Sequence, residues 1–150
     1  MEVDRNAPVV ALSEGQIDAL PEVVWDVLTG LELWPSWNPD VKSVEVNGPV
    51  AEGTEFRWKS KAGTIRSRIE RLDPPRLVGW TGRTMGIDAV HVWRLEPRDA
   101  GTRVQTEESF SGLLARVMRG RIQKTLDAAL ENGVRQLKAE AERRSAPESA

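Results

Sequence analysis

The sequence predicts an α+β fold: a curved, seven-stranded antiparallel sheet with two short helices and one long C-terminal helix across its concave face. Three patterns predict it. From Val41 to Phe110 apolar and polar residues alternate with a period of two, and turn residues interrupt this region every eight to twelve positions. After Gly112 the period becomes helical and stays so to about Arg143. Before the alternating region, prolines delimit two short helical segments.

The strands follow from composition and from their separators. Residues Pro8 to Ile17 are apolar without helical spacing and predict a first strand. Gly, Pro, Asn and Asp between the later segments suit tight reversals of the chain. Six further strands are expected at Val41–Asn47, Thr54–Ser60, Thr64–Leu72, Leu77–Arg83, Ile87–Glu96 and Thr102–Phe110.

Local sequence patterns also predict the helices. Pro21 suits the first position of a helix that ends at Gly30, and a further turn or two over Leu31–Trp37 is ended by prolines. The C-terminal helix would be roughly 45 Å long at 1.5 Å per residue, which is longer than a small sheet is wide. It must therefore cross the concave face. Its apolar stripe comprises Leu114, Val117, Met118, Ile122, Leu126, Ala129, Leu130, Val134 and Leu137.

Length and composition limit the possible functions. A chain of 150 residues, 39% apolar, predicts one domain over 1–144, and the small polar residues 145–150 predict a disordered tail. The charges nearly cancel, 21 basic against 23 acidic, so no nucleic-acid partner is expected. Without a long apolar run or a signal-peptide pattern, we expect a cytoplasmic protein with no stable membrane association.

Much catalytic chemistry is excluded by residue type. Cysteine and tyrosine are absent and His91 is the only histidine. Thiol nucleophiles and metal sites with several His or Cys ligands are therefore excluded, and no metal or cofactor is expected. Ser67 and Ser109 lack the Gly-x-Ser-x-Gly context of a nucleophile, which makes a hydrolase a poor hypothesis.

Alternation along the strands identifies the side chains that face the helix. We expect these residues to line an apolar cavity between sheet and helix, because four or five inward tryptophans are separated by small residues. The alternative is that the aromatic rings simply fill a strongly curved core. Trp34 and Trp37 either contact a ligand or only anchor the short helices. The candidate ligand-binding residues are Trp34, Trp37, Phe56, Trp58, Ser67, Trp80, Ala89, His91, Trp93, Thr106, Glu108, Met118 and Ile122.

His91 and Glu108 are the only titratable pair expected on the buried face. A turn at Asp99–Ala100 would place them directly opposite one another on neighbouring strands, within hydrogen-bonding reach. A carboxylate beside imidazole raises the pKa of the histidine and lowers its own, whereas burial does the reverse to both. The pair is either catalytic, moving protons in an aldol-type cyclisation or dehydration, or a satisfied structural contact. A register slip of two residues would instead separate the two groups.

A basic cluster marks the start of the long helix. Arg116, Arg119, Arg121 and Lys124 could meet an anionic lipid or a ligand carboxylate. They lie off the apolar stripe, however, and interspersed basic faces are ordinary on helices. We therefore expect them to be solvated.

Several segments of the chain resemble those of a known superfamily. They are Ile17–Trp25, Trp34–Pro39, Asp73–Trp80, His91–Trp93, Gly101–Val104 and Glu107–Gly112. The resemblance covers about Val9 to Leu137 and is with SRPBCC proteins, which have the helix-grip or START-like fold, and especially with their polyketide cyclase/dehydrase-like branch. It implies an apolar ligand between sheet and helix; some members are aromatases or cyclases, and others are lipid carriers or coactivators.

Three functions are therefore kept open. The leading hypothesis is a monomer or homodimer that binds an apolar, aromatic or polycyclic small molecule or lipid. The second is a polyketide aromatase/cyclase or dehydrase, a lyase or isomerase that uses His91 and Glu108. The third is a protein-interaction module with a vestigial cavity. Fold class alone does not choose among them.

Overall fold

The computed structural model describes residues 1–61 and 63–146. The strands are β1 (Val9–Ile17), β2 (Val41–Val46), β3 (Glu55–Ser60), β4 (Gly63–Asp73), β5 (Leu77–Thr84), β6 (Ile87–Arg98) and β7 (Gly101–Ser111). The helical elements are α1 (Pro21–Thr29), the 3-10 turn η1 (Leu31–Leu33), α2 (Trp34–Trp37), α3 (Leu113–Val117) and α4 (Arg119–Ser145).

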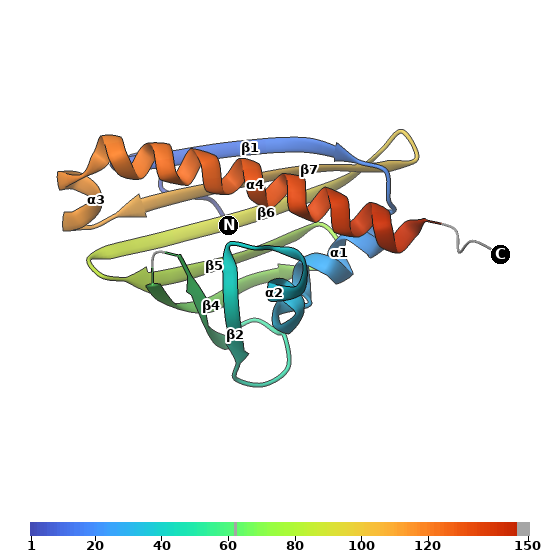
Figure 1. Cartoon of the computed structure of the whole chain (residues 1–150), viewed down its shortest axis with the longest axis horizontal. Coiled ribbons are helices and arrows are strands. Elements are labelled where there is room, and N and C mark those ends of the chain that lie inside the picture. Colours follow the sequence, from blue (N-terminus) through green and yellow to red (C-terminus); the bar gives the residue numbers. More distant parts are fainter. Residues whose placement is uncertain (62, 147–150) are drawn as a thin grey trace.

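The strands form one antiparallel sheet in the order β1-β7-β6-β5-β4-β3-β2. Consecutive strands from β2 to β7 are therefore neighbours, and β1 is the edge strand next to β7. Helix α4 runs alongside β1 and β7, α1 lies against the C-terminal part of α4, and α2 lies beside β2 (Figure 1). The predicted seven-stranded sheet with short helices and a C-terminal helix is confirmed. None of the helices in the described ranges is long and apolar enough to cross a membrane.

Two buried clusters join the helices to the sheet. The larger one brings Val134, Leu137 and Ala141 of α4 against α1 and the middle strands. The smaller one packs Leu126 and Leu130 of α4 on Val9 and Ala11 of β1. The helical stripe expected from the sequence therefore does bury α4 against the sheet, but along the β1 side.

The expected continuous helix from Gly112 to Arg143 is wrong at its start. The chain leaves helical geometry at Met118 (φ −108°, ψ 31°), which separates α3 from α4. Leu113 and Val117 are 74% and 71% exposed. The amide of Leu114 donates to the carbonyl of Gly86, 3.3 Å away, so α3 is held at the β5–β6 turn beyond the end of the sheet. Apolar spacing continues through this region, although Ala115 is the only residue of α3 that is buried.

The C-terminal boundary also differs from expectation. Helix α4 includes Ser145, the first residue of the expected tail, and Ala146 follows it as the C-cap. Residues 147–150 of that expected tail lie outside the described part of the chain.

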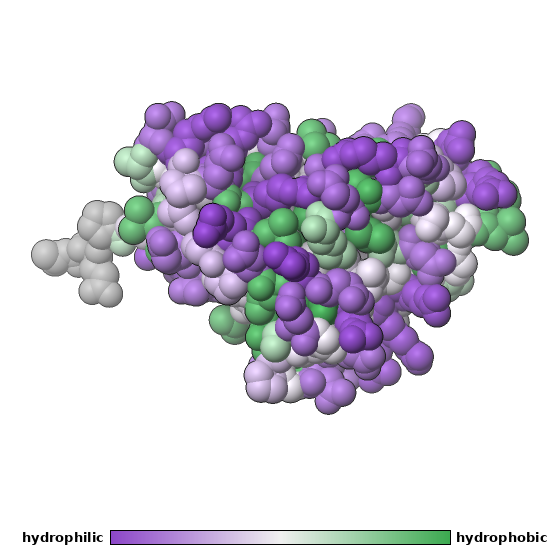
Figure 2. All heavy atoms as spheres, turned by 180° about the vertical axis from the view of Figure 1, so that it is seen from behind, coloured by the Kyte–Doolittle hydropathy of each residue, from purple (hydrophilic) through white to green (hydrophobic). Residues whose placement is uncertain are grey.

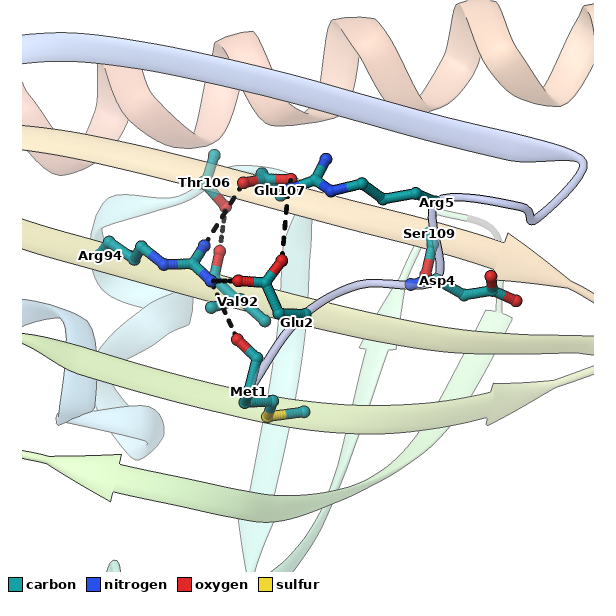
Figure 3. A network of polar contacts seen from close by, with 9 residues as sticks. All are labelled: Met1, Glu2, Asp4, Arg5, Val92, Arg94, Thr106, Glu107 and Ser109. Carbon is teal, nitrogen blue, oxygen red and sulfur yellow. Dashed lines mark hydrogen bonds and ion pairs between the residues drawn. The ribbon is translucent and has the colours of Figure 1, made fainter.

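The N-terminal segment covers the face of the sheet opposite α4, which the sequence did not predict. Figure 3 shows residues 1–5 crossing β5, β6 and β7. Glu107 of β7 is only 4% exposed there, and its carboxylate lies 2.8 Å from Arg5 and 3.4 Å from Arg94. Arg94 also donates to the carbonyl of Met1 at 2.9 Å. Charge pairing thus fastens an otherwise irregular segment to the sheet.

We expect Arg94→Gln to lower the free energy of unfolding by about 1–3 kcal/mol, because it removes a charged donor from Glu107, Met1 and Glu2. The matched control is Arg98→Gln, since the Arg98 side chain is half-exposed and, among the described residues, its ion pair is with Glu96 on its own strand. That control should change the free energy by no more than about 0.5 kcal/mol. Urea denaturation measures both, and equal losses would show that the N-terminal network adds nothing to stability.

Candidate functional site

Aromatic side chains from α2, β3 and β5 meet on the concave face. The Trp34 ring lies between those of Trp58 and Trp80, with centroid separations of 5.9 and 5.4 Å. The Phe56 ring centroid lies 5.8 Å from that of Trp34 and 6.0 Å from that of Trp80. Edge-to-face and tilted contacts at these distances are favourable. The Trp34 indole also donates to the carbonyl of Leu28 at 3.0 Å, so Trp34 anchors α2 to the end of α1.

The aromatic contacts continue into β6. The ring centroids of Trp80 and His91 lie 4.9 Å apart, and those of His91 and Trp93 lie 5.6 Å apart. Trp93 lies beneath α4, where the ring comes close to Gly133. The rings expected to wall a cavity therefore contact one another in this conformation, which agrees with the alternative that they fill a curved core.

His91 of β6 faces Glu108 of β7, as the register predicts. His91 Nδ1 lies 3.4 Å from Glu108 Oε1, and the two side chains are 12% and 14% exposed. On the other side of the ring, His91 Nε2 lies 2.8 Å from Thr106 Oγ1. The three side chains form one polar group among aromatic rings.

The hydrogen bonds of Thr106 favour one tautomer of His91. Thr106 has one hydroxyl proton, which it donates to the carbonyl of Val92 at 3.3 Å. Its oxygen therefore accepts from His91 Nε2–H, and Nδ1 carries a lone pair that faces Glu108. A protonated Glu108 is the state that suits this lone pair.

Burial supports the same protonation states. It raises the pKa of Glu108 from 4.5 to about 8 and lowers the pKa of His91 from 6.5 to about 3. Both side chains are thus neutral near neutral pH. Within the described residues, the polar contact of the Glu108 carboxyl is the 3.4 Å approach to His91 Nδ1.

Two tryptophans hold buried donors without acceptors. Trp93 Nε1 and Trp37 Nε1 have no hydrogen-bond partner among residues 1–61 and 63–146. An unpaired buried donor costs about 1–3 kcal/mol. Trp58 differs, because its indole donates to Ser67 at 3.2 Å. Trp93, whose ring centroid lies 5.6 Å from that of His91, therefore carries an unused donor.

Other candidate residues lie apart from this group. Ala89 is half-buried on β6, opposite Phe110. Ile122 packs with the smaller cluster on β1. Met118 lies at the break between α3 and α4 and is 37% exposed. Its expected place in a cavity wall depended on the continuous helix, which the structure corrects.

The sequence did not predict the surface hollows, of which the described residues line a larger and a smaller one. The larger, of about 570 Å³, lies beside the β5–β6 turn and is lined by arginines from three neighbouring strands, Arg57, Arg66 and Arg83, and by Leu113. The smaller, of about 270 Å³, lies on β2 and β3 beside Trp58. Outward-facing arginines at aligned positions of β3, β4 and β5 were the signal that could have identified the first.

The fold and the buried polar group indicate the family of proteins to which the chain belongs. The family model for polyketide cyclase/dehydrase and lipid transport matches residues 11–142. The chain belongs to this family, and its fold is the helix-grip, START-like fold of SRPBCC proteins. Comparison with curated proteins gives no match.

Solved structures share this fold. The hypothetical protein jhp0584 from Helicobacter pylori has a TM-score of 0.81 at 16% identity, over 93% of this chain and 91% of the other. The aromatase/cyclase Zhui from Streptomyces sp. R1128 gives 0.79 at 19%, over 91% and 95%. A START superfamily protein from Mycobacterium smegmatis gives 0.77 at 14%, over 89% and 97%. At such identities the likeness concerns the fold.

Proposed function

We propose that the protein binds an apolar, aromatic or polycyclic small molecule on the concave face, between the sheet and α4. The observation that carries the proposal is the unpaired buried donor Trp93 Nε1–H, together with the buried His91–Glu108 pair on the same face. Ligand sites combine apolar walls with a few convergent polar groups. A flat ligand with a carbonyl oxygen fits both features. Binding requires the aromatic rings to separate, as side-chain rotation can allow.

The family description supports this chemistry, since it includes lipid transport as well as polyketide cyclases. In the proposed complex the ligand carbonyl accepts from Trp93 or Glu108, and Trp80 and Trp34 contact the flat faces of the ligand. His91 keeps its hydrogen bond to Thr106 and thereby fixes the orientation of its ring.

Prodan, a neutral naphthalene ketone, tests the proposal by energy transfer from tryptophan. We expect saturable transfer, and we expect Trp93→Phe to weaken affinity by about 2- to 10-fold, the value of one net hydrogen bond. The matched control is Trp25→Phe, because Trp25 is buried in the same core but lies on α1. Absence of saturable transfer, or equal weakening by the two variants, would contradict the proposal.

The second candidate function is a cyclase or dehydrase reaction. The observation that favours it is the 3.4 Å contact between Glu108 Oε1 and His91 Nδ1, at a place where burial raises the pKa of Glu108 to about 8. Glu108 then protonates a substrate carbonyl as general acid, and His91 Nδ1 accepts a proton as general base. Zhui is named as an aromatase/cyclase and shares the fold.

Affinity and turnover separate the two functions. If the pair is catalytic, Glu108→Gln and His91→Gln should each lower the rate with a polyketide-like ketone by about 10²- to 10⁴-fold, while changing affinity little. If the parent protein binds the ketone and forms no product, the result supports the binding function over the enzymatic one. A substrate turned over equally by parent and variants would remove His91 and Glu108 from catalysis.

A further inference from the structure

Exposed apolar side chains gather at the end of the molecule formed by α3 and the β5–β6 turn. Met85, Leu113 and Val117 are 80%, 74% and 71% exposed, and Met118 is 37% exposed. Figure 2 shows hydrophobic atoms at the surface on the right-hand end of the molecule, next to hydrophilic ones. The other large exposed apolar residues of the described ranges are scattered singly over other elements. We call this end, with Met85 and residues 112–124, the α3 tip.

The α3 tip is also strongly basic. No Asp or Glu occurs between Ser111 and Leu126, whereas the whole chain carries a net charge of -2. None of the four cations in this stretch forms an ion pair within the described residues. These cations are Arg116, Arg119, Arg121 and Lys124. Positive charge without compensation is thus concentrated around the apolar side chains.

The backbone holds the apolar residues outward. Gly112 adopts φ 103°, which suits glycine, and turns the chain from β7 into α3. The Leu114 amide bonds to the Gly86 carbonyl, and Ala115 is fully buried. Leu113 and Val117 are four residues apart on this anchored turn, so both project from one side of it. Their exposure follows from the fold of the segment and is maintained by it.

From these observations we infer that the α3 tip docks reversibly on anionic phospholipid bilayers. Met85, Leu113 and Val117 enter the boundary between head groups and acyl chains, and the four cations contact lipid phosphates. A symmetric pairing of two copies through this surface would place its cations against one another, which disfavours a dimer here. The contact is peripheral and differs from stable anchoring. It depends on surface residues alone and holds whether or not the concave face binds a ligand.

Vesicle cosedimentation of the full chain tests the inference, with phosphatidylcholine alone compared with phosphatidylcholine mixed with phosphatidylglycerol. We expect binding to the mixed vesicles that weakens as salt is raised, and little binding to phosphatidylcholine alone. Arg119→Gln with Arg121→Gln should weaken binding by roughly 10- to 30-fold. Leu113→Ser with Val117→Ser should weaken it by at least roughly tenfold.

Two matched control pairs define the surface. Leu20→Ser with Leu33→Ser changes comparably exposed leucines outside the α3 tip, and Arg71→Gln with Arg76→Gln changes exposed arginines at β4 and the β4–β5 turn. Both controls should bind vesicles like the parent. Equal loss in a control pair, no binding to the mixed vesicles, or binding unaffected by the Leu113 and Val117 changes would overturn the inference. Self-association through the tip, seen by sedimentation velocity and abolished by those changes, would also overturn it.

Discussion

Leu137→Ala is expected to lower the free energy of unfolding by about 2–5 kcal/mol, the cost typical of truncating a buried leucine. Leu137 is fully buried in the cluster that joins α4 to α1 and the middle strands. Alanine would leave a cavity at the contact that keeps α4 on the sheet. The loss should therefore exceed that of any exposed apolar position.

Urea denaturation of Leu137→Ala and of Leu33→Ala measures this difference. Leu33 is 53% exposed in the η1 turn, so its truncation should change the free energy by no more than about 0.5 kcal/mol. If the two variants unfold alike, α4 is not packed on the sheet as described, and no site between them can exist.

Stability should fall by roughly 2 kcal/mol between pH 6.5 and pH 8 because of Glu108. Its pKa is raised from 4.5 to about 8 on folding, so the unfolded chain loses this proton first and gains stability relative to the native state as pH rises. The contribution of Glu108 is fully present below pH 4.5 and is lost as pH approaches 8. Glu108→Gln, which mimics the neutral acid, should remove this fall.

His91 has the opposite dependence. Its pKa falls from 6.5 to about 3 on folding, so stability is lost as pH decreases through that range. The two slopes oppose one another between pH 4.5 and 6.5, where stability should be nearly constant. Differences between parent, Glu108→Gln and His91→Gln isolate these groups from other carboxyls. A difference between parent and Glu108→Gln that does not change with pH would mean that Glu108 is ionised in the native state.

Local patterns predicted most of the fold because strands and helices differ in period. Alternation placed Trp93 and Glu108 on the concave face, and a turn at Asp99–Ala100 set His91 opposite Glu108. Both features depend only on counting residues along neighbouring strands. Helix α4 was predicted for the same reason, since Leu126, Leu130 and Leu137 recur at helical spacing.

Features that depend on tertiary contacts could not be predicted in this way. The N-terminal segment has no period, and it is held by pairs such as Arg5 with Glu107 that are distant in sequence. The break at Met118 has no signal in the sequence, because the apolar spacing continues through it. Contacts among the tryptophan rings depend on side-chain orientation, so the sequence could not decide between a cavity wall and a filled core.

The central claim is that a ligand binds on the concave face beside Trp93 and His91. The most direct measurement follows the indole N–H resonances of the six tryptophans by NMR while prodan is added, with Trp93→Phe used to assign its signal. The claim predicts a saturable shift of the Trp93 resonance together with the His91 ring signals, while Trp25 on α1 stays unchanged. Saturable binding that leaves Trp93 and His91 unshifted, or shifts confined to residues of the α3 tip, would contradict it.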